Sequence, residues 1–402
     1  MKEKIFYILI LSVLFLGYNL TTAMGLERNL VLLFFLLLGL VIIAPKIKYS
    51  APKALKLLLI FVIIYGILRN FFDTREGTRF LIIQIIGTPI LFSAANKFLD
   101  LNIVPDRYIR LWSKIFKALI FSFLVVTGMA LVERVTGHII LGWSDVTYEG
   151  VDISTEFRST SLLGHPLANA LFVTIIMNFL LITPIRNKYK YGLWTLGFVS
   201  LLCFNTRSSI VGCLLMMGLY VARTIVFNRK VSLTTKISTV FLSVIIGGLC
   251  YVLVYNYGFG GRLLDMGLFD DSSAQTRVNA WDFINYIKIN DLLYGISFDQ
   301  KELLKLQLGV FGLENFWIDM TLGYGLLIFI PYVLLTVKVI RETYKGYSLF
   351  DALFTTSAFV LTASTNNSLA TDFTPLFVFL ICCVLFHPDN IKHITPNKYL
   401  TE

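Results

Sequence analysis

The strongest constraint on this chain is a series of long apolar runs that recur along the whole sequence. In a lipid bilayer such a run becomes a helix, because every backbone N–H and C=O group must find its hydrogen bond within the segment. Only 15% of the residues are charged, against about 25% in soluble globular domains. The sequence therefore predicts an all-α integral membrane protein that forms one polytopic domain over residues 1–402.

The apolar runs predict about twelve transmembrane helices. We place them at residues 5–22, 29–44, 55–71, 79–96, 113–132, 166–185, 190–206, 209–227, 236–256, 315–337, 349–365 and 373–387. The first run resembles a signal peptide, but its apolar core is long and further spans follow at once, so we interpret it as an uncleaved span.

The placement of lysine and arginine predicts the orientation of the chain. With the N-terminus in the cytoplasm, the inside segments hold 23 of the 35 Lys and Arg residues and the outside segments hold 12. Cytoplasmic loops carry such an excess, so we expect both termini in the cytoplasm. The net charge of +10 does not indicate a nucleic-acid partner, because it forms no basic face or tail.

Two outer loops are long, at residues 133–160 and 257–313, the second between spans nine and ten. In the second loop, Ser272 and Asp299 each precede a Gln or Glu by three residues, which is the spacing of a capping box. Gly309 follows the second apolar stretch as a stop signal. We therefore expect a large helical outer loop with short amphipathic helices at the membrane surface.

No metal or cofactor is predicted. All five cysteines lie inside apolar runs, and no pair has metal-ligand spacing, so we interpret them as packing residues. The chain contains no Walker loop, no H-E-x-x-H and no Rossmann glycine pattern.

A group of polar residues opens the sixth span. A proline is tolerated only in the first turn of a helix, so Pro166 starts the span and His165 caps it. Arg158 then lies at the outer lip, beside the positive end of a helix. The alternative interpretation of Arg158 is an interfacial arginine whose charged tip reaches out to water.

Arg207 occupies the turn between the seventh and eighth spans. Only 16 residues separate it from Lys190, about 24 Å of helix against a hydrocarbon core of about 30 Å. The turn is thus expected below the outer surface, where an arginine faces a protein interior or a water-filled cavity. A structural ion pair is the alternative.

Two further groups are predicted at the same membrane face. Arg277 opens a helix of the large loop, with Trp281 one turn later; the alternative is a solvated surface charge. Glu314 and Asn315 stand at the outer end of the tenth span, and Asp319 follows one turn later. A carboxylate within a span is a functional candidate, although Asp319 could instead pair with one of the arginines.

These residues indicate a phosphorylated ligand. Arginine forks match phosphate oxygens, and a carboxylate can take the proton of an attacking hydroxyl. The ligand that this combination suggests is a lipid-anchored phosphate or diphosphate, reached from the outside.

Four motifs, "RSTSLLGHPLANALF", "NTRSSIVG", "RVNAWDFINYI" and "ENFWIDMTLGYGLLIF", resemble the O-antigen ligase/polymerase superfamily in order and spacing. These are bacterial membrane glycosyltransferases of the broad GT-C type. The resemblance implies a GT-C-like fold, a multi-pass protein of the bacterial cytoplasmic (inner) membrane, and a metal-independent transfer from undecaprenyl-diphosphate-linked glycan. The implied function is polymerisation of repeat units into surface polysaccharide such as O-antigen, capsule or exopolysaccharide.

The resemblance also implies roles for individual residues. Arg158 and Arg277 are similar to the family arginines that hold the diphosphate, and Arg207 to the basic residue of the short turn. Ligases have a histidine where this chain has Glu314–Asn315, which favours the polymerase branch. Glu314 is then the first candidate for the base, and His165 is the second. The predicted catalytic residues are thus Glu314, Arg158 and Arg277, and the predicted substrate-binding residues are Arg207, Trp281, Asn315, His165 and Asp319.

Two alternatives stay open. The first is an O-antigen ligase that transfers the glycan to lipid A-core. The second is a flippase for lipid-linked glycans or a small-solute transporter, although the charges gather at the outer lip instead of mid-span. Expected partners are the undecaprenyl-diphosphate-linked glycan and membrane lipid, with a chain-length regulator or flippase as candidate protein partners.

Overall fold

The structure of the chain is a computed structural model. It describes residues 2–17, 20–21, 24–25, 60, 64, 106–141, 157–227, 233–260, 279–310, 313, 315–365, 369 and 374–394. The predicted spans 29–44, 55–71 and 79–96 lie outside the described residues, apart from single positions. Within the described segments, the regular elements are helices and include no β-strand.

Eight described helices overlap with predicted spans, though their bounds differ by up to seven residues. They are α1 (Lys2–Phe15), α6 (Asp106–Thr136), α7 (Pro166–Ile182), α8 (Asn187–Phe204), α9 (Arg207–Ala222), α10 (Leu233–Tyr257), α16 (Leu349–Ser364) and α18 (Thr374–Leu385). Apolarity is enough to place such helices, because the bilayer leaves no other way to satisfy the backbone.

Membrane-crossing length is reached by a smaller set. Among the described residues, Ile109–Thr136, Arg207–Val226 and Lys236–Tyr257 are long and apolar enough to cross a membrane. A fourth span results if α18 and α19 (Pro388–Ile394), bent by 80°, are counted as one. The chain is therefore helical, with helices suited to a membrane; the number of twelve spans and the GT-C-like architecture stay predictions.

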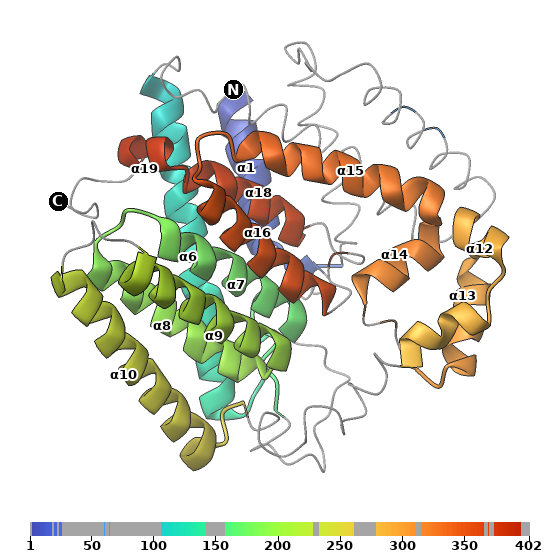
Figure 1. Ribbon diagram of the computed structural model, residues 1–402, viewed down its shortest axis with the longest axis horizontal. Coiled ribbons are helices and arrows are strands. Elements are labelled where there is room, and N and C mark those ends of the chain that lie inside the picture. Colours follow the sequence, from blue (N-terminus) through green and yellow to red (C-terminus); the bar gives the residue numbers. More distant parts are fainter. Residues whose placement is uncertain are drawn as a thin grey trace.

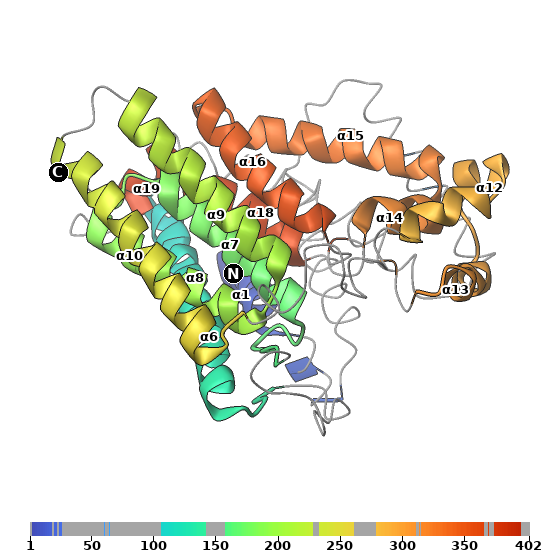
Figure 2. The same ribbon diagram turned by 60° about the horizontal axis from the view of Figure 1, so that its bottom comes forward.

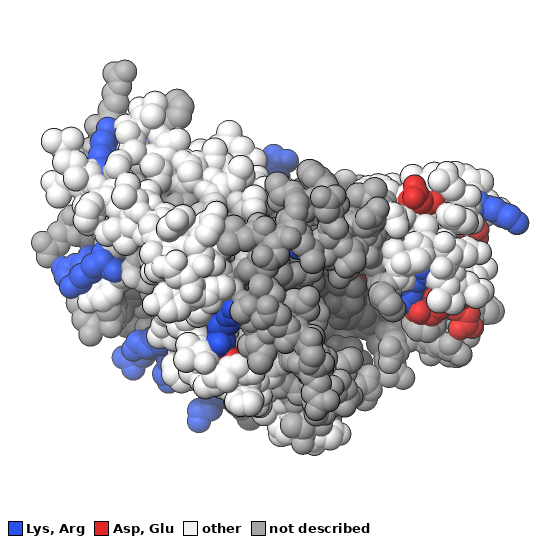
Figure 3. All heavy atoms as spheres, turned by 90° about the horizontal axis from the view of Figure 1, so that it is seen from below, with Lys and Arg blue, Asp and Glu red and all other residues white. Residues whose placement is uncertain are grey.

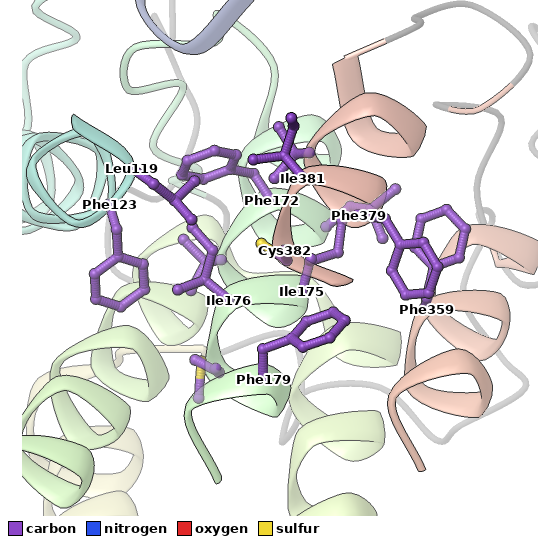
Figure 4. Close-up of a cluster of buried hydrophobic side chains, with 14 of the residues drawn as sticks. Leu119, Phe123, Phe172, Ile175, Ile176, Phe179, Phe359, Phe379, Ile381 and Cys382 are labelled. Carbon is purple, nitrogen blue, oxygen red and sulfur yellow. The ribbon is translucent and has the colours of Figure 1, made fainter. Parts of the chain in front are cut away.

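Helix α7 forms the centre of the bundle (Figure 1). Every residue of α7 except Ile182 is buried, as expected for a helix that is apolar on all sides. Figure 4 shows its side chains Phe172, Ile175, Ile176 and Phe179 between those of α6, α16 and α18. Phe379 of α18 stacks on Phe359 of α16, with ring centroids 4.3 Å apart, so one continuous apolar core joins the N-terminal and C-terminal halves.

The tenth predicted span, residues 315–337, is wrong as a single helix. The structure divides it into α14 (Phe316–Tyr324) and α15 (Leu326–Thr343) at Gly325, whose φ is 73°. A Cβ at Gly325 would lie 2.2 Å from the carbonyl oxygen of Leu293. The break therefore depends on a close backbone contact with another segment.

The large outer loop contains three short helices, η4 (Ala280–Asn285, a 3₁₀ helix), α12 (Ile289–Tyr294) and α13 (Phe298–Gln307). With α14 they enclose a small apolar core of their own, apart from the main bundle (Figure 2). Acidic side chains gather over this group in Figure 3. The helix start expected at Ser272 lies outside the described residues, and Trp281 lies in η4.

The predicted cap of α13 at Asp299 is wrong by two residues. Ser297 is the cap: its Oγ accepts a hydrogen bond from Gln300 N at 3.3 Å, while Ser297 N donates to Gln300 Oε1 at 3.0 Å. Both positions offered an N-cap side chain, and the reciprocal glutamine bond selects Ser297. Gly309, at φ 64°, follows the helix end as predicted.

The end of the bundle opposite the Arg158 loop is held by a partly buried ion pair. The five-residue π-helix η2 (Arg223–Phe227) continues α9, and Arg223 forms an ion pair with Asp351 of α16. The guanidinium of Arg223 also lies 4.1 Å from the ring centroid of Phe350. These contacts fix α9 against α16 at this end.

Candidate functional site

The segment that carries Arg158 lies against the turn between α8 and α9. Ser159 N donates to the carbonyl oxygen of Cys203 at 3.1 Å, and Arg158 Nε donates to that of Phe204 at 3.4 Å. Since α9 begins at Arg207, the structure brings Arg158 to the turn that carries Arg207. The predicted convergence of these two arginines is therefore present in the described fold.

The α8–α9 turn leaves the N-terminus of α9 without a side-chain cap. Asn205 adopts a left-handed conformation, with φ 53°, and ends α8. Thr206 is the N-cap residue of α9, yet its side chain makes no capping hydrogen bond. Helices α8 and α15 also start without a side-chain cap, whereas α7, α13, α14 and α16 are each capped by a side chain. The N-terminus of α9 carries the positive partial charge of the helix dipole, and no N-cap side chain accepts a hydrogen bond from the N–H groups of its first turn.

Two buried hydroxyl groups lie in the same first turn. Thr206 is 3% exposed and Ser209 is 0% exposed. Within the part of the chain that the structure describes, Thr206 Oγ1 and Ser209 Oγ have no hydrogen-bond partner. Buried polar atoms without a partner are rare. Next to a helix N-terminus and two arginines, they form an arrangement suited to a bound anion.

His165 acts as the predicted helix cap. Its Nδ1 accepts a hydrogen bond from Leu167 N at 3.3 Å, with Pro166 as the first residue of α7. The cap role is therefore confirmed, and a contact of His165 with substrate stays a prediction.

The group around the tenth span is arranged differently from the expectation. Asn315 caps α14, since its Oδ1 accepts from Trp317 N at 2.9 Å and from Ile318 N at 3.3 Å. Asp319 forms an ion pair with Lys301 of α13, so the alternative of a structural pair is present with a lysine in place of an arginine. Lys301 was missed because its pairing depends on how α13 packs against α14.

The remaining predicted residues are only partly placed. Trp281 is 54% exposed on η4, and Arg277 and Glu314 lie outside the described residues. Their convergence with Arg158 stays a prediction.

The C-terminal end of helix α16 contacts both α14 and α9. Trp317 Nε1 of α14 donates to Ser364 Oγ, at the C-terminal end of α16, at 2.7 Å. Gly212 of α9 faces Thr362 of the same helix, since a Cβ there would lie 3.8 Å from Thr362 Oγ1. The N-terminal parts of α14 and α9, which carry Asn315 and Arg207, therefore both lie near the C-terminal end of α16 (Figure 1).

Sequence reasoning missed the pair Glu133 and Arg134, at the end of α6. Both are buried, at 0% and 9% exposure, and both contact the outer loops. The available signal was a pair of adjacent charges directly after an apolar run, which predicts a functional or structural polar site.

No protein-family model and no curated protein sequence matches the chain. Among the described residues, no group of three or more His, Cys, Asp or Glu side chains could hold a metal ion. Membership of the O-antigen ligase/polymerase superfamily stays a prediction that depends on the four sequence motifs.

Proposed function

We propose that this chain is a membrane glycosyltransferase that polymerises undecaprenyl-diphosphate-linked oligosaccharide repeat units into surface polysaccharide on the outer face of the bacterial cytoplasmic membrane. The observation that carries the proposal is the placement of Arg158 beside the uncapped N-terminus of α9. That helix end adds Arg207 and two buried hydroxyls, Thr206 and Ser209.

The chemistry of this arrangement suits a diphosphate. Helix N-termini bind anions through free N–H groups and a positive partial charge. Arginine guanidinium groups add paired donors that fit two phosphate oxygens. Below a lipid surface these interactions are stronger than in water, because the local dielectric constant is lower.

The proposed reaction is a direct displacement. A hydroxyl oxygen of the acceptor glycan attacks the anomeric carbon of the donor sugar, and the bond from that carbon to the diphosphate oxygen breaks. The electron pair stays on the diphosphate, where Arg158, Arg207 and the N-terminus of α9 stabilise the developing charge. The proton of the acceptor hydroxyl passes to Glu314. The sequence resemblance suggests this role, and Glu314 lies outside the described residues.

The test is a set of arginine substitutions in the native host. Arg158→Ala and Arg207→Ala should each lower the yield of long polysaccharide by about 100-fold or more, by analogy with the loss of one preorganised charge-stabilising donor. Single repeat units should accumulate. Arg158→Lys should also fail, because an ammonium group cannot donate in parallel to two oxygens. The readout is polysaccharide length on a gel, with membrane insertion checked by blotting.

Arg341→Ala is the matched control, since Arg341 is an exposed arginine in the last turn of α15, which leads away from the outer end of α14. Normal polymer in both Arg158→Ala and Arg207→Ala would refute the proposal. Normal polymer length with loss of attachment to lipid A-core would favour a ligase. Repeat units trapped on the cytoplasmic side would favour a flippase.

A further inference from the structure

The carboxylate of Glu133 accepts several hydrogen bonds from the loop that carries Arg158. Glu133 Oε2 accepts hydrogen bonds from Thr160 N at 3.0 Å, from Ser161 N at 2.9 Å and from Ser159 Oγ. Its Oε1 accepts from Ile140 N at 3.0 Å. Glu133 is fully buried, so these four donors replace the water that a carboxylate would otherwise need.

The loop needs such support because its backbone is strained. Ser161 has a φ of 42°, and only Ser161 and Asn205 among the described non-glycine residues have a positive φ. Serine adopts this region at a cost in free energy, which the surrounding contacts must offset. One contact is Glu133, and another is Asn169 of α7, whose Oδ1 accepts from Leu163 N at 3.2 Å and whose Nδ2 donates to Thr160 O.

The next residue of α6 holds the second outer loop. Arg134 donates to the carbonyl oxygen of Gly258 at 2.6 Å. Its guanidinium carbon lies 5.1 Å from the ring centroid of Phe259 and 5.8 Å from that of Phe157. Gly258 and Phe259 open the loop that leads to Arg277. Glu133 and Arg134, adjacent at the C-terminal end of α6, thus form hydrogen bonds with both long outer loops.

We propose that Glu133 is a positioning residue that fixes the strained 157–161 segment and so sets Arg158 against the N-terminus of α9, while Arg134 ties the second loop to the same helix end. This inference depends on the proposed function for the role of Arg158. Glu133 does not contact the lipid diphosphate itself: it is fully buried and both of its oxygens already accept hydrogen bonds from the chain.

The test is a double-mutant cycle on the purified full-length protein in lipid nanodiscs, with undecaprenyl diphosphate as the probe. Glu133→Ala and Arg158→Ala should each raise the Kd by about tenfold or more, because the first removes the hydrogen bonds that position Arg158 and the second removes the guanidinium itself. In the double variant, the Kd should equal that of Arg158→Ala alone, because Glu133 acts through Arg158. Additive effects would overturn the positioning role.

The conservative and control variants sharpen the test. Glu133→Gln keeps one carbonyl oxygen for the Thr160 and Ser161 amides, so its Kd should stay within about threefold of the wild-type value. Asp351→Asn breaks a partly buried ion pair at the other end of α16, so it should lower the melting temperature and leave the Kd unchanged.

A ligand-free readout separates the two proposals. Amide hydrogen exchange at Thr160 and Ser161 should accelerate by about tenfold or more in Glu133→Ala and stay unchanged in Asp351→Asn, because the amides lose their acceptor. Unchanged exchange would refute the positioning role whatever the protein binds. If exchange accelerates while Arg158→Ala and the wild type bind the probe equally, the support by Glu133 stands and the proposed function is wrong.

Discussion

Thr206 and Ser209 place two buried hydroxyl groups in one helical turn, and the described part of the chain offers neither a hydrogen bond. An unsatisfied buried hydroxyl lowers the stability of the free protein. The same hydroxyls become useful when an anion arrives, because each can donate to an oxygen. Stability and binding should therefore respond with opposite signs when a hydroxyl is removed.

Thr206→Val tests this at the residue scale. Valine keeps the shape and removes the hydroxyl, so the free energy of unfolding should rise by about 1 kcal/mol. The affinity for undecaprenyl diphosphate should fall by about tenfold. Thermal melting in detergent and a nanodisc binding titration give the two numbers.

Thr127→Val is the matched control, since Thr127 is buried in α6 and its Oγ1 donates to Phe123 O at 2.9 Å. This variant should not gain stability and should bind normally. An equal response of both variants would show that the Thr206 hydroxyl has no special role.

The sequence predicts residues whose role follows from topology, and misses those whose role follows from distant contacts. Arg158 and Arg207 could be placed together because alternating spans bring outer ends to one face. Glu133 could not be assigned, since its partners Ser159, Thr160 and Ser161 come 26 to 28 residues later in a strained loop. No local pattern encodes that conformation.

At the scale of elements, the long apolar runs correctly predicted the helices of the core. They did not predict the helix break at Gly325. The run 315–337 is mostly apolar, with Asp319 as its single charged residue, so hydropathy alone predicts one helix. The break into α14 and α15 depends on the backbone of Leu293 and Tyr294, which lies within 2.6 Å of where a Cβ would stand. This boundary depends on a contact between two segments that are distant in the sequence. No local sequence pattern predicts such a contact.

A pair of glycine substitutions tests the break. Gly325→Ala should lower the free energy of unfolding by more than about 1 kcal/mol, because alanine is disfavoured at positive φ and would clash with the Leu293 carbonyl. Gly323→Ala is the comparison, since a Cβ there meets nothing within 4 Å inside α14.

Gly323→Ala should be neutral or stabilising by about 0.5–1 kcal/mol, the usual gain of alanine over glycine in a helix. Thermal melting of both purified variants is the measurement. Equal melting temperatures would mean that the joint at Gly325 imposes no backbone constraint.

At the scale of the whole molecule, the ends of the described helices form two groups at opposite ends of the bundle. The Arg158 loop, the α8–α9 turn and the end of α10 meet at one end through Cys203, Phe204 and Gly258. The Arg223–Asp351 pair lies at the other end of α9 and α16. The excess of lysine and arginine predicts that the second group faces the cytoplasm.

Reporter fusions test this orientation. Alkaline phosphatase fused after Gly260, at the start of the second long loop, should be active because that loop is expected outside the cytoplasm. Green fluorescent protein fused after Glu402 should fluoresce because the C-terminus is expected in the cytoplasm. An inactive phosphatase at Gly260 would invert the topology and place the Arg158 site on the cytoplasmic side.

The enclosure of α7 has a consequence for the order of assembly. In the proposed membrane protein, α7 would enter the bilayer long before α16 and α18, which cover part of it in the finished protein (Figure 4), so lipid would contact that part of α7 in the interval. A helix in lipid has to satisfy its own polar groups. Asn178 does so, since its Nδ2 donates to Thr174 O one turn earlier at 2.8 Å. This local hydrogen bond would satisfy the Asn178 Nδ2 donor before α16 and α18 are synthesised.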